Sequence, residues 1–181
     1  MVEAVFLDRD GVLNRGFVKD GKSYAPRSIK EFRLLPYAAV SVKKLREAGY
    51  LVIVVTNQPD INNGLITRET VDEMHLKLKN KTLVNDIFLC PHSRKENCNC
   101  RKPKSGMLIE ASRKYNINLK KSFMIGDRAS DIAAGIEAGC RTIFINRSYY
   151  ETAPLNQEIT FLSIKSATNY IIKQDKNYEK F

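Results

Sequence analysis

Short apolar runs alternate along this chain with longer segments whose apolar residues recur at helical spacing. The apolar runs are rich in strand formers and predict buried strands over 5–7, 51–55, 87–89, 122–125 and 142–145. Helical spacing predicts helices over 37–48, 67–83, 106–115 and 130–138, and Gly49 and Gly139 follow the ends of two of them. Because strands and helices alternate, we expect an α/β fold with helices on both faces of a mainly parallel sheet.

Two segments have weaker patterns. Glycines and prolines interrupt residues 15–36, which are expected to form a long connection of the kind that often contributes to a binding site. In the tail, residues 159–172 predict one amphipathic helix. We expect a single domain over 1–181, with its core at about 2–147 and a C-terminal tail at 148–181. A chain of 181 residues is long enough to bury a substantial core.

Composition narrows the classes of partner. The chain is 43% hydrophobic and 28% charged, as is usual for soluble globular proteins. Its 30 Lys and Arg residues exceed its 20 Asp and Glu residues, and a net charge of +10 suits an anionic ligand. Basic blocks do not alternate with aromatic residues, so no nucleic-acid partner is expected. No run is long enough to cross a bilayer, so we expect a cytoplasmic protein without a membrane partner. We also expect a monomer.

Two carboxylates, Asp8 and Asp10, come directly after the first predicted strand and are followed by Gly11. Residues i and i+2 share a side of an extended segment, so both side chains are expected to face one spot, although a solvated turn uses the same residue types. Asp127 follows a later strand, and three such carboxylates suit a hard cation such as Mg²⁺. Asp131 is either a further member of this group or a first-turn residue favoured by the helix dipole.

Three of the four cysteines lie in one short segment with one of the two histidines. The segment is Cys90-Pro-His92 followed by Cys98-Asn-Cys100. Four soft or borderline ligands at this spacing suit a closed, structural zinc site. In the alternative, Cys90 is a buried small hydrophobe and His92 is incidental, but the concentration of ligands favours a metal. We therefore expect the folding of this loop to depend on Zn²⁺.

Two further segments carry groups that bind phosphate. Thr56, Asn57 and Gln58 follow the second predicted strand, and their hydroxyl, amide and backbone N–H groups can donate to phosphate oxygens. Arg101 and Lys102 come directly after the last cysteine of the metal segment, so a bound zinc ion would also fix their direction. A guanidinium beside an ammonium suits a phosphorylated ligand. Taken alone, each segment is equally compatible with a simple solvated turn.

The order Asp-x-Asp-Gly, Thr-Asn-Gln, Arg-Lys-Pro and Gly-Asp-x-x-x-Asp over 4–146 resembles the haloacid dehalogenase-like phosphatases. The added cysteine and histidine loop is similar to that of the zinc-bearing group in this family. The resemblance implies a Rossmann-like three-layer sandwich without a large cap domain. It also implies that Asp8 is the nucleophile that accepts the phosphoryl group, and that Asp10 is first the general acid and then the general base. Mg²⁺ would bind the side chains of Asp8 and Asp127 and the backbone carbonyl of Asp10.

The same resemblance implies roles for the other polar residues. Thr56 and Lys102 would hold the phosphoryl oxygens, and Asp131 would support them. The expected substrate contacts are Arg9, Asn57, Gln58, Arg101 and Arg128. His75 lies in a lysine-rich helical stretch and is expected at the surface.

The zinc-bearing group includes phosphatases of heptose 1,7-bisphosphate and of histidinol phosphate. The five residues between His92 and Cys98 are similar to the histidinol-phosphate form. Tyr24-Ala25-Pro26 and Ala134-Gly135 look more like the heptose form. We expect removal of the 7-phosphate of D-glycero-D-manno-heptose 1,7-bisphosphate. The alternatives are a histidinol-phosphate phosphatase, a polynucleotide 3′-phosphatase and a non-catalytic binding module stabilised by zinc.

Overall fold

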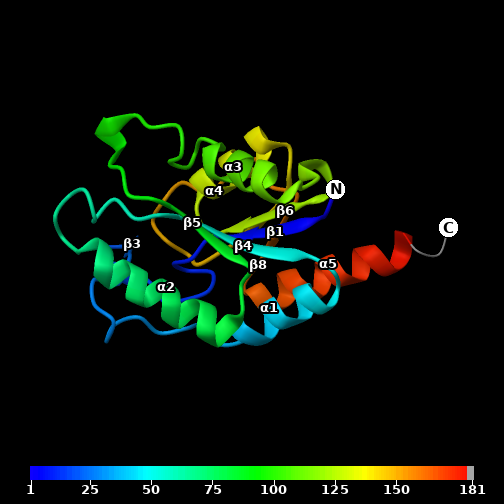
Figure 1. Ribbon diagram of the computed structural model, residues 1–181, viewed down its shortest axis with the longest axis horizontal. Coiled ribbons are helices and arrows are strands. Elements are labelled where there is room, and N and C mark those ends of the chain that lie inside the picture. Colours follow the sequence, from blue (N-terminus) through cyan, green and yellow to red (C-terminus); the bar gives the residue numbers. More distant parts are fainter. Residues whose placement is uncertain (179–181) are drawn as a thin grey trace.

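A six-stranded parallel sheet forms the centre of the protein, in the order β5-β4-β1-β6-β7-β8 (Figure 1). The computed structural model describes residues 1–178. The strands of this sheet are β1 (Ala4–Leu7), β4 (Leu51–Asn57), β5 (Asp86–Cys90), β6 (Phe123–Gly126), β7 (Arg141–Ile145) and β8 (Ile159–Phe161). The chain moves outward from β1 to one edge and then returns to the other, so a crevice forms beyond the carboxyl ends of β1, β4 and β6.

Helices cover both faces of this sheet, as predicted (Figure 1). One face is covered by α1 (Ala38–Glu47), α2 (Arg68–Thr82) and α5 (Ile164–Tyr178). The other face is covered by α3 (Gly106–Tyr115) and α4 (Ala129–Ala138). Two short 3-10 helices, η1 (Arg94–Glu96) and η2 (Leu119–Lys121), lie in the connections. Among the described residues, none of the helices combines the length and apolar character that spanning a membrane requires.

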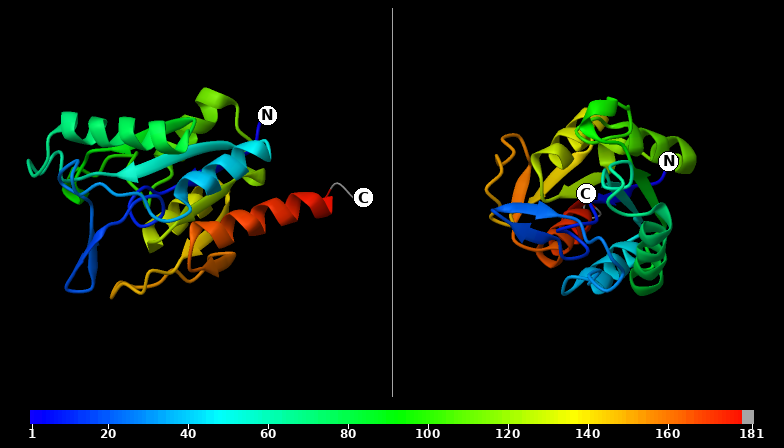
Figure 2. Two further views of the ribbon diagram at one scale, coloured as in Figure 1. Left: turned by 90° about the horizontal axis from the view of Figure 1, so that it is seen from below. Right: turned by 90° about the vertical axis from the view of Figure 1, so that its left-hand side faces the viewer.

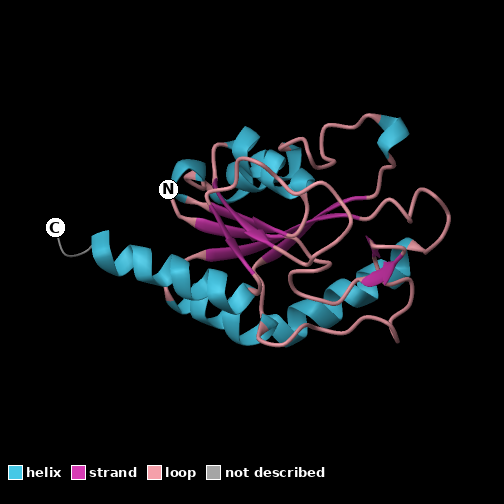
Figure 3. Cartoon of the chain, turned by 180° about the vertical axis from the view of Figure 1, so that it is seen from behind, coloured by secondary structure: helices cyan, strands magenta, loops and turns pink. Residues whose placement is uncertain are grey.

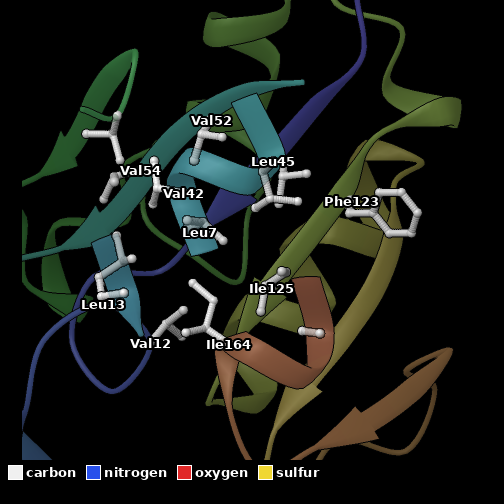
Figure 4. Packing of buried hydrophobic residues seen from close by; sticks show 14 of the residues in the cluster. Leu7, Val12, Leu13, Val42, Leu45, Val52, Val54, Phe123, Ile125 and Ile164 are labelled. Carbon is white, nitrogen blue, oxygen red and sulfur yellow. The ribbon is translucent and has the colours of Figure 1, made fainter. Parts of the chain in front are cut away.

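Each central strand is buried on both faces, which explains its uninterrupted apolar sequence. In β1, Leu7 packs into the core beneath α1, α2 and α5, while its neighbour Phe6 packs into the core beneath α3 and α4. Both side chains have no exposed surface, and complete burial of a side chain of this size stabilises the fold by about 1.5–3 kcal/mol. Figure 4 shows the first core, with the labelled residues Leu7, Val12, Leu13, Val42, Leu45, Val52, Val54, Phe123, Ile125 and Ile164. The two cores hold β1 firmly and so fix the position of the residue that follows it.

Residues 15–36 contain a hairpin where only a long connection was expected. Strands β2 (Phe17–Lys19) and β3 (Lys22–Tyr24) pair antiparallel and project beyond the main sheet (Figure 2). The turn residues Asp20 and Gly21 have φ angles of 50° and 71°, the left-handed conformation that tight hairpin turns require. Figure 3 shows this hairpin at the same end of the molecule as the long loops, away from the C-terminus.

The tail also differs from the prediction of one helix over 159–172. Residues Ile159–Phe161 form β8, which pairs parallel with β7, and α5 begins only at Ile164. Ile159 and Phe161 are half-buried while Thr160 between them is exposed, so this segment follows the period of a strand. Three residues are too few to separate this period from helical spacing in the sequence.

Candidate active site

The polar residues that follow β1, β4 and β6 converge on one cleft of about 800 Å³ at the carboxyl edge of the sheet. Asp8 and Asp10 line it from β1, and Asn57 and Gln58 line it from β4. Further walls come from the hairpin around Tyr24, from the cysteine-rich loop and from the start of α4. The basic residues in this lining are Arg94, Arg101, Lys102, Lys104 and Arg128. The lining also contains the carboxylates of Asp8, Asp10, Asp60 and Asp131, so its cations exceed its anions by one. The basic residues away from the floor make the cleft suitable for an anionic ligand.

Lys102 lies at the floor of the cleft, where it is only 3% exposed. Its Nζ atom lies 2.6 Å from Asp8 Oδ1, 2.7 Å from Asp131 Oδ1 and 2.7 Å from the carbonyl oxygen of Val55. Burial alone would lower the pKa of Lys102, but the charges of Asp131 and Asp8 raise it above its ordinary value. The lysine therefore remains an ammonium ion that holds all three donor positions toward fixed oxygens.

Asp8, Asp127 and Asp131 form a compact cluster of carboxylates beside this lysine. One oxygen from each lies within 4.8 Å of the others. Burial raises the pKa of Asp8 to about 6 against the opposing effect of Lys102, and the charges of Asp131 and Asp10 add to the rise. Burial, followed by the charges of Asp8 and Asp131, raises the pKa of Asp127 well above its ordinary value. One ammonium thus leaves this cluster with uncompensated negative charge.

The cluster also fits a divalent cation by its geometry. Asp127 Oδ1 is buried and has no hydrogen-bond partner among the described residues, whereas Tyr149 Oη donates to Asp127 Oδ2 over 2.9 Å. Gly11 has a φ of 89°, and a Cβ atom there would lie 1.7 Å from Asp127 Oδ2, so only glycine leaves room for this carboxylate. An unpaired carboxylate oxygen within an all-oxygen donor set matches the preference of Mg²⁺.

The carboxylate of Asp10 is held from three sides. Asn14 Nδ2 donates to Oδ1 over 2.8 Å, and Gln58 Nε2 donates to Oδ2 over 2.7 Å. The guanidinium of Arg9 contacts both oxygens, with its shortest distance 3.0 Å from Nη2 to Oδ2. Gln58 Nε2 also lies 2.9 Å from Thr56 Oγ1, so the Gln58 amide joins Asp10 after β1 to the end of β4. The carboxyl group of Asp10 is therefore fixed in position and still lines the cleft.

Thr56 and Asn57 differ in how they relate to the cleft. Thr56 is 1% exposed and is not among the described residues that line the cleft. Asn57 lines it but uses its side-chain amide to bind the backbone of Lys102, donating to the carbonyl over 3.0 Å and accepting from the N–H over 3.1 Å. Asn57 thus connects β4 to the segment that carries Lys102. Its contact with a ligand remains a prediction.

The four metal-type residues of the loop come together as the spacing predicts. Cys90 Sγ lies 3.6 Å from both Cys98 Sγ and His92 Nδ1, while Cys100 Sγ lies 3.4 Å from Cys98 Sγ and 3.3 Å from His92 Nδ1. A tetrahedron with Zn–S bonds of about 2.3 Å has S–S edges of about 3.8 Å, close to these separations. The loop also lines the cleft through Arg94, Cys98 and Arg101. Arg101 Nη1 donates to the carbonyl oxygen of His92 over 2.9 Å, which ties its side chain to the loop.

Two residues lie elsewhere than the sequence analysis expected. The prediction that His75 is a surface residue is wrong, because it is 9% exposed and contacts Arg9. Arg9, which was expected to contact the substrate, has no exposed surface and is absent from the described lining of the cleft. Its guanidinium contacts Asp10 instead. Arg94 and Lys104 also line the cleft, although no role was predicted for either side chain, and only their position in or next to the cysteine-rich loop could have indicated one.

The remaining predicted contact, Arg128, lines the cleft at the start of α4. It donates to the backbone carbonyl of Ser23 in the hairpin and lies 3.6 Å from Glu151. Asp131 caps the first turn of α4 by accepting from the backbone N–H of Arg128 over 3.0 Å, while its other oxygen contacts Lys102. Both alternatives considered for Asp131, a member of the carboxylate cluster and a first-turn residue, therefore describe the same side chain.

Comparison with known proteins gives consistent results. Residues 99–171 match the family model described as HAD-hydrolase-like. The chain is 35% identical over 164 residues to D-glycero-alpha-D-manno-heptose-1,7-bisphosphate 7-phosphatase from Photorhabdus laumondii, covering 84% of this chain and 86% of the relative. It is also 35% identical over 144 residues to the D-glycero-beta-D-manno-heptose-1,7-bisphosphate 7-phosphatase of Helicobacter pylori J99, covering 75% and 78%.

A solved structure matches over nearly the whole chain. The D,D-heptose 1,7-bisphosphate phosphatase from B. bronchiseptica, complexed with magnesium and phosphate, has a TM-score of 0.82 and 25% sequence identity. The match covers 95% of this chain and 99% of that one. The complex shows that a relative with this fold holds both the cation and the anion for which the cleft is suited.

Proposed function

This chain belongs to the haloacid dehalogenase-like phosphatases, and from that premise we propose that it removes the 7-phosphate of D-glycero-D-manno-heptose 1,7-bisphosphate. The observation that carries the proposal is the charge layout of the cleft. Lys102 and the carboxylate cluster form its floor, and four further cations stand around them: Arg94, Arg101, Lys104 and Arg128. One phosphoryl group at the floor leaves these cations, of which Arg128 also faces Glu151, for a second anionic group on the same molecule. A cleft of about 800 Å³ has room for a sugar with a phosphate at each end.

In the first step, a carboxylate oxygen of Asp8 attacks the phosphorus atom as the bond to the sugar oxygen breaks. Lys102 Nζ, 2.6 Å from Asp8 Oδ1, orients the carboxylate and offers positive charge to the phosphoryl oxygens. Asp10 enters this step in its protonated form and donates its proton to the departing sugar oxygen, so the product leaves as a neutral alcohol. The phosphoryl group is now held by Asp8 as a mixed anhydride.

In the second step, water attacks the phosphorus atom of this anhydride. Asp10, now a carboxylate, takes the proton of that water, and the bond from phosphorus to Asp8 breaks. Free phosphate leaves, while Asp8 and Asp10 return to their starting forms. Asn14, Gln58 and Arg9 hold Asp10 in place for both proton transfers.

We assign a Mg²⁺ ion to the carboxylate cluster. Asp8 and Asp127 would hold it through their side chains, together with the backbone carbonyl of Asp10. When bound, Mg²⁺ neutralises the negative charge that builds up on the phosphoryl oxygens. The unpaired Asp127 Oδ1 supports this assignment.

We assign a structural Zn²⁺ ion to Cys90, His92, Cys98 and Cys100. All four positions of a tetrahedral site are filled by protein ligands, which leaves none for a reacting water. By closing the loop, the ion would hold Arg101 and the following Lys102 toward the cleft. The loop therefore contributes to catalysis only through the direction of these side chains.

A side-by-side assay of phosphate release tests the substrate. Both anomers of the heptose bisphosphate, histidinol phosphate and a 3′-phosphorylated oligonucleotide are compared with Mg²⁺ present. We expect the highest kcat/KM with one anomer of the heptose bisphosphate and a product that keeps its 1-phosphate. The two relatives differ in the anomer that their names give, so either preference supports the proposal. A preference for histidinol phosphate or the oligonucleotide would overturn it.

A further inference from the structure

Arg9 occupies an unusual position for a charged residue, because its side chain has no exposed surface at all. Its guanidinium contacts both oxygens of Asp10 and lies over the ring of Phe32, 5.6 Å from the ring centroid. An arginine buried in this way cannot reach a ligand in the cleft. It must instead have its donors satisfied within the protein, because unpaired buried charge is strongly destabilising.

His75 satisfies one of these donors from the other side. Arg9 Nη1 lies 3.2 Å from His75 Nε2. A guanidinium can only donate, so Nε2 accepts and the ring proton is on Nδ1. Burial, reinforced by the charge of Arg9, lowers the pKa of His75 to about 3, and the ring is therefore neutral at physiological pH and able to accept. His75 lies on α2, 66 residues from Arg9 in the chain, so this contact joins the helix layer to the end of β1.

We propose that His75 is a positioning residue for proton transfer, which acts through Arg9 to hold the carboxyl group of Asp10 toward the leaving group. The proposal rests on the phosphatase activity of the family and not on the identity of the sugar. Neither His75 nor Arg9 touches the cleft, so neither is a catalytic residue. Their effect on the reaction comes from the direction of Asp10 alone.

The physical argument concerns what remains when the imidazole is removed. Asn14 and Gln58 each bind one oxygen of Asp10, and both are neutral amides. Arg9 is the contact that binds both oxygens, so its own position sets the plane of the carboxylate. Without an acceptor at position 75, Arg9 Nη1 loses its hydrogen-bond partner, and the guanidinium is no longer held on the side away from Asp10. It can then shift and rotate the Asp10 carboxyl group with it. The proton of Asp10 must point at a lone pair of the leaving-group oxygen, so even a small rotation of Asp10 slows the proton transfer.

The test separates proton donation from every other step by the choice of leaving group. A primary alkyl phosphate needs a proton on its leaving oxygen, whereas p-nitrophenyl phosphate releases an anion that is stable in water. The ratio kcat/KM reports only the steps up to release of this first product, so later hydrolysis of the enzyme-bound phosphoryl group does not enter. For His75→Leu we expect kcat/KM for the alkyl ester to fall by about tenfold or more, and that for the nitrophenyl ester by less than about threefold.

Three variants control for structural effects. His75→Gln keeps a carbonyl acceptor of similar reach. Its kcat/KM for the alkyl ester should be within about threefold of wild type. General-acid catalysis contributes about 10²–10⁴-fold, and only part of this contribution depends on the position of Asp10. His75→Asn is too short to reach Arg9 and should behave as His75→Leu, which provides a second route if the leucine variant does not fold. Val71→Ala removes a buried apolar group one turn from His75 on the same helix and leaves the polar groups of His75 and Arg9 in place. It should lower kcat/KM for both esters equally or leave both unchanged.

The outcomes that contradict the proposal are distinct. Equal losses on both esters, no loss on either, or a glutamine variant as impaired as a folded asparagine variant would each show that His75 is only structural. If the heptose assignment is wrong, the assays give a different result. The wild-type protein would then leave the heptose bisphosphate intact while still hydrolysing p-nitrophenyl phosphate, and another primary phosphate ester would serve for the comparison.

Discussion

Burial of His75 also has a consequence for stability, because the folded protein keeps the imidazole neutral where the unfolded chain protonates it. The groups that act on it are known from their positions. Burial lowers the pKa of His75 most, the charges of Arg9, Arg68 and Lys79 lower it further, and Asp10 raises it. A base whose pKa is lowered by folding stabilises the protein above its unfolded pKa, and this stabilisation is lost as the pH falls toward the folded pKa.

The size of the effect follows from the two pKa values. The unfolded value is 6.5 and the folded value is about 3. Between roughly pH 7 and pH 5 the unfolded chain becomes protonated at His75 while the folded protein does not. The free energy of unfolding should therefore fall by about 2 kcal/mol through this one group, at about 1.4 kcal/mol for each pKa unit.

Urea unfolding of wild type and His75→Gln at both pH values measures this effect. Other groups titrate in the same range, including Asp8 with its pKa of about 6, but they are shared by the two proteins and cancel in the difference. The stability advantage of wild type over His75→Gln should shrink by about 2 kcal/mol on going from roughly pH 7 to pH 5. A stability advantage that stays constant within about 0.5 kcal/mol would show that the folded protein protonates His75 readily. The assignment of His75 as a buried, neutral hydrogen-bond acceptor would then be wrong.

Three further changes test other parts of the structure. Lys102→Met leaves Asp131 without its buried partner and should lower kcat by about 10²-fold or more, measured by phosphate release with saturating Mg²⁺; unchanged turnover would remove Lys102 from the site. Cys98→Ser should lower the zinc content found by elemental analysis below that of wild type and reduce kcat/KM; full zinc occupancy would contradict the ligand assignment. Gly135→Ala places a Cβ atom 2.7 Å from Met124 Cβ and should destabilise by about 1–3 kcal/mol in urea unfolding, whereas a stabilised variant would refute the close packing.

The central strands could be predicted because each is buried on both faces and therefore has an uninterrupted apolar sequence. This is the case for β1, β4 and β6, and the residues that follow them supply the predicted carboxylates and amides. The edge strand β8 has only three residues and is half-buried, so its period was too short to recognise. Its pairing with β7 is a contact between distant segments, which local pattern does not contain.

Motifs predicted which residues surround the cleft but not how they contact one another. The contact between Lys102 and Asp131 joins the loop before α3 to the first turn of α4, and neither segment shows it alone. His75 illustrates the same limit more strongly. Neighbouring lysines in α2 suggested a surface position, whereas burial depends on which side of the helix meets the end of β1. Sequence patterns identify chemistry that is local in the chain, and packing decides the contacts that support it.

The claim on which the whole account depends is that Asp8 carries the phosphoryl group, and chemical trapping tests it directly. Borohydride reduces an aspartyl phosphate to homoserine and leaves free carboxylates unchanged. Protein quenched during turnover with Mg²⁺ and substrate should contain homoserine at position 8, found by mass spectrometry of the N-terminal peptide, and protein without substrate should not. Sustained phosphate release with position 8 always recovered as aspartate, or homoserine at another carboxylate, would contradict the account.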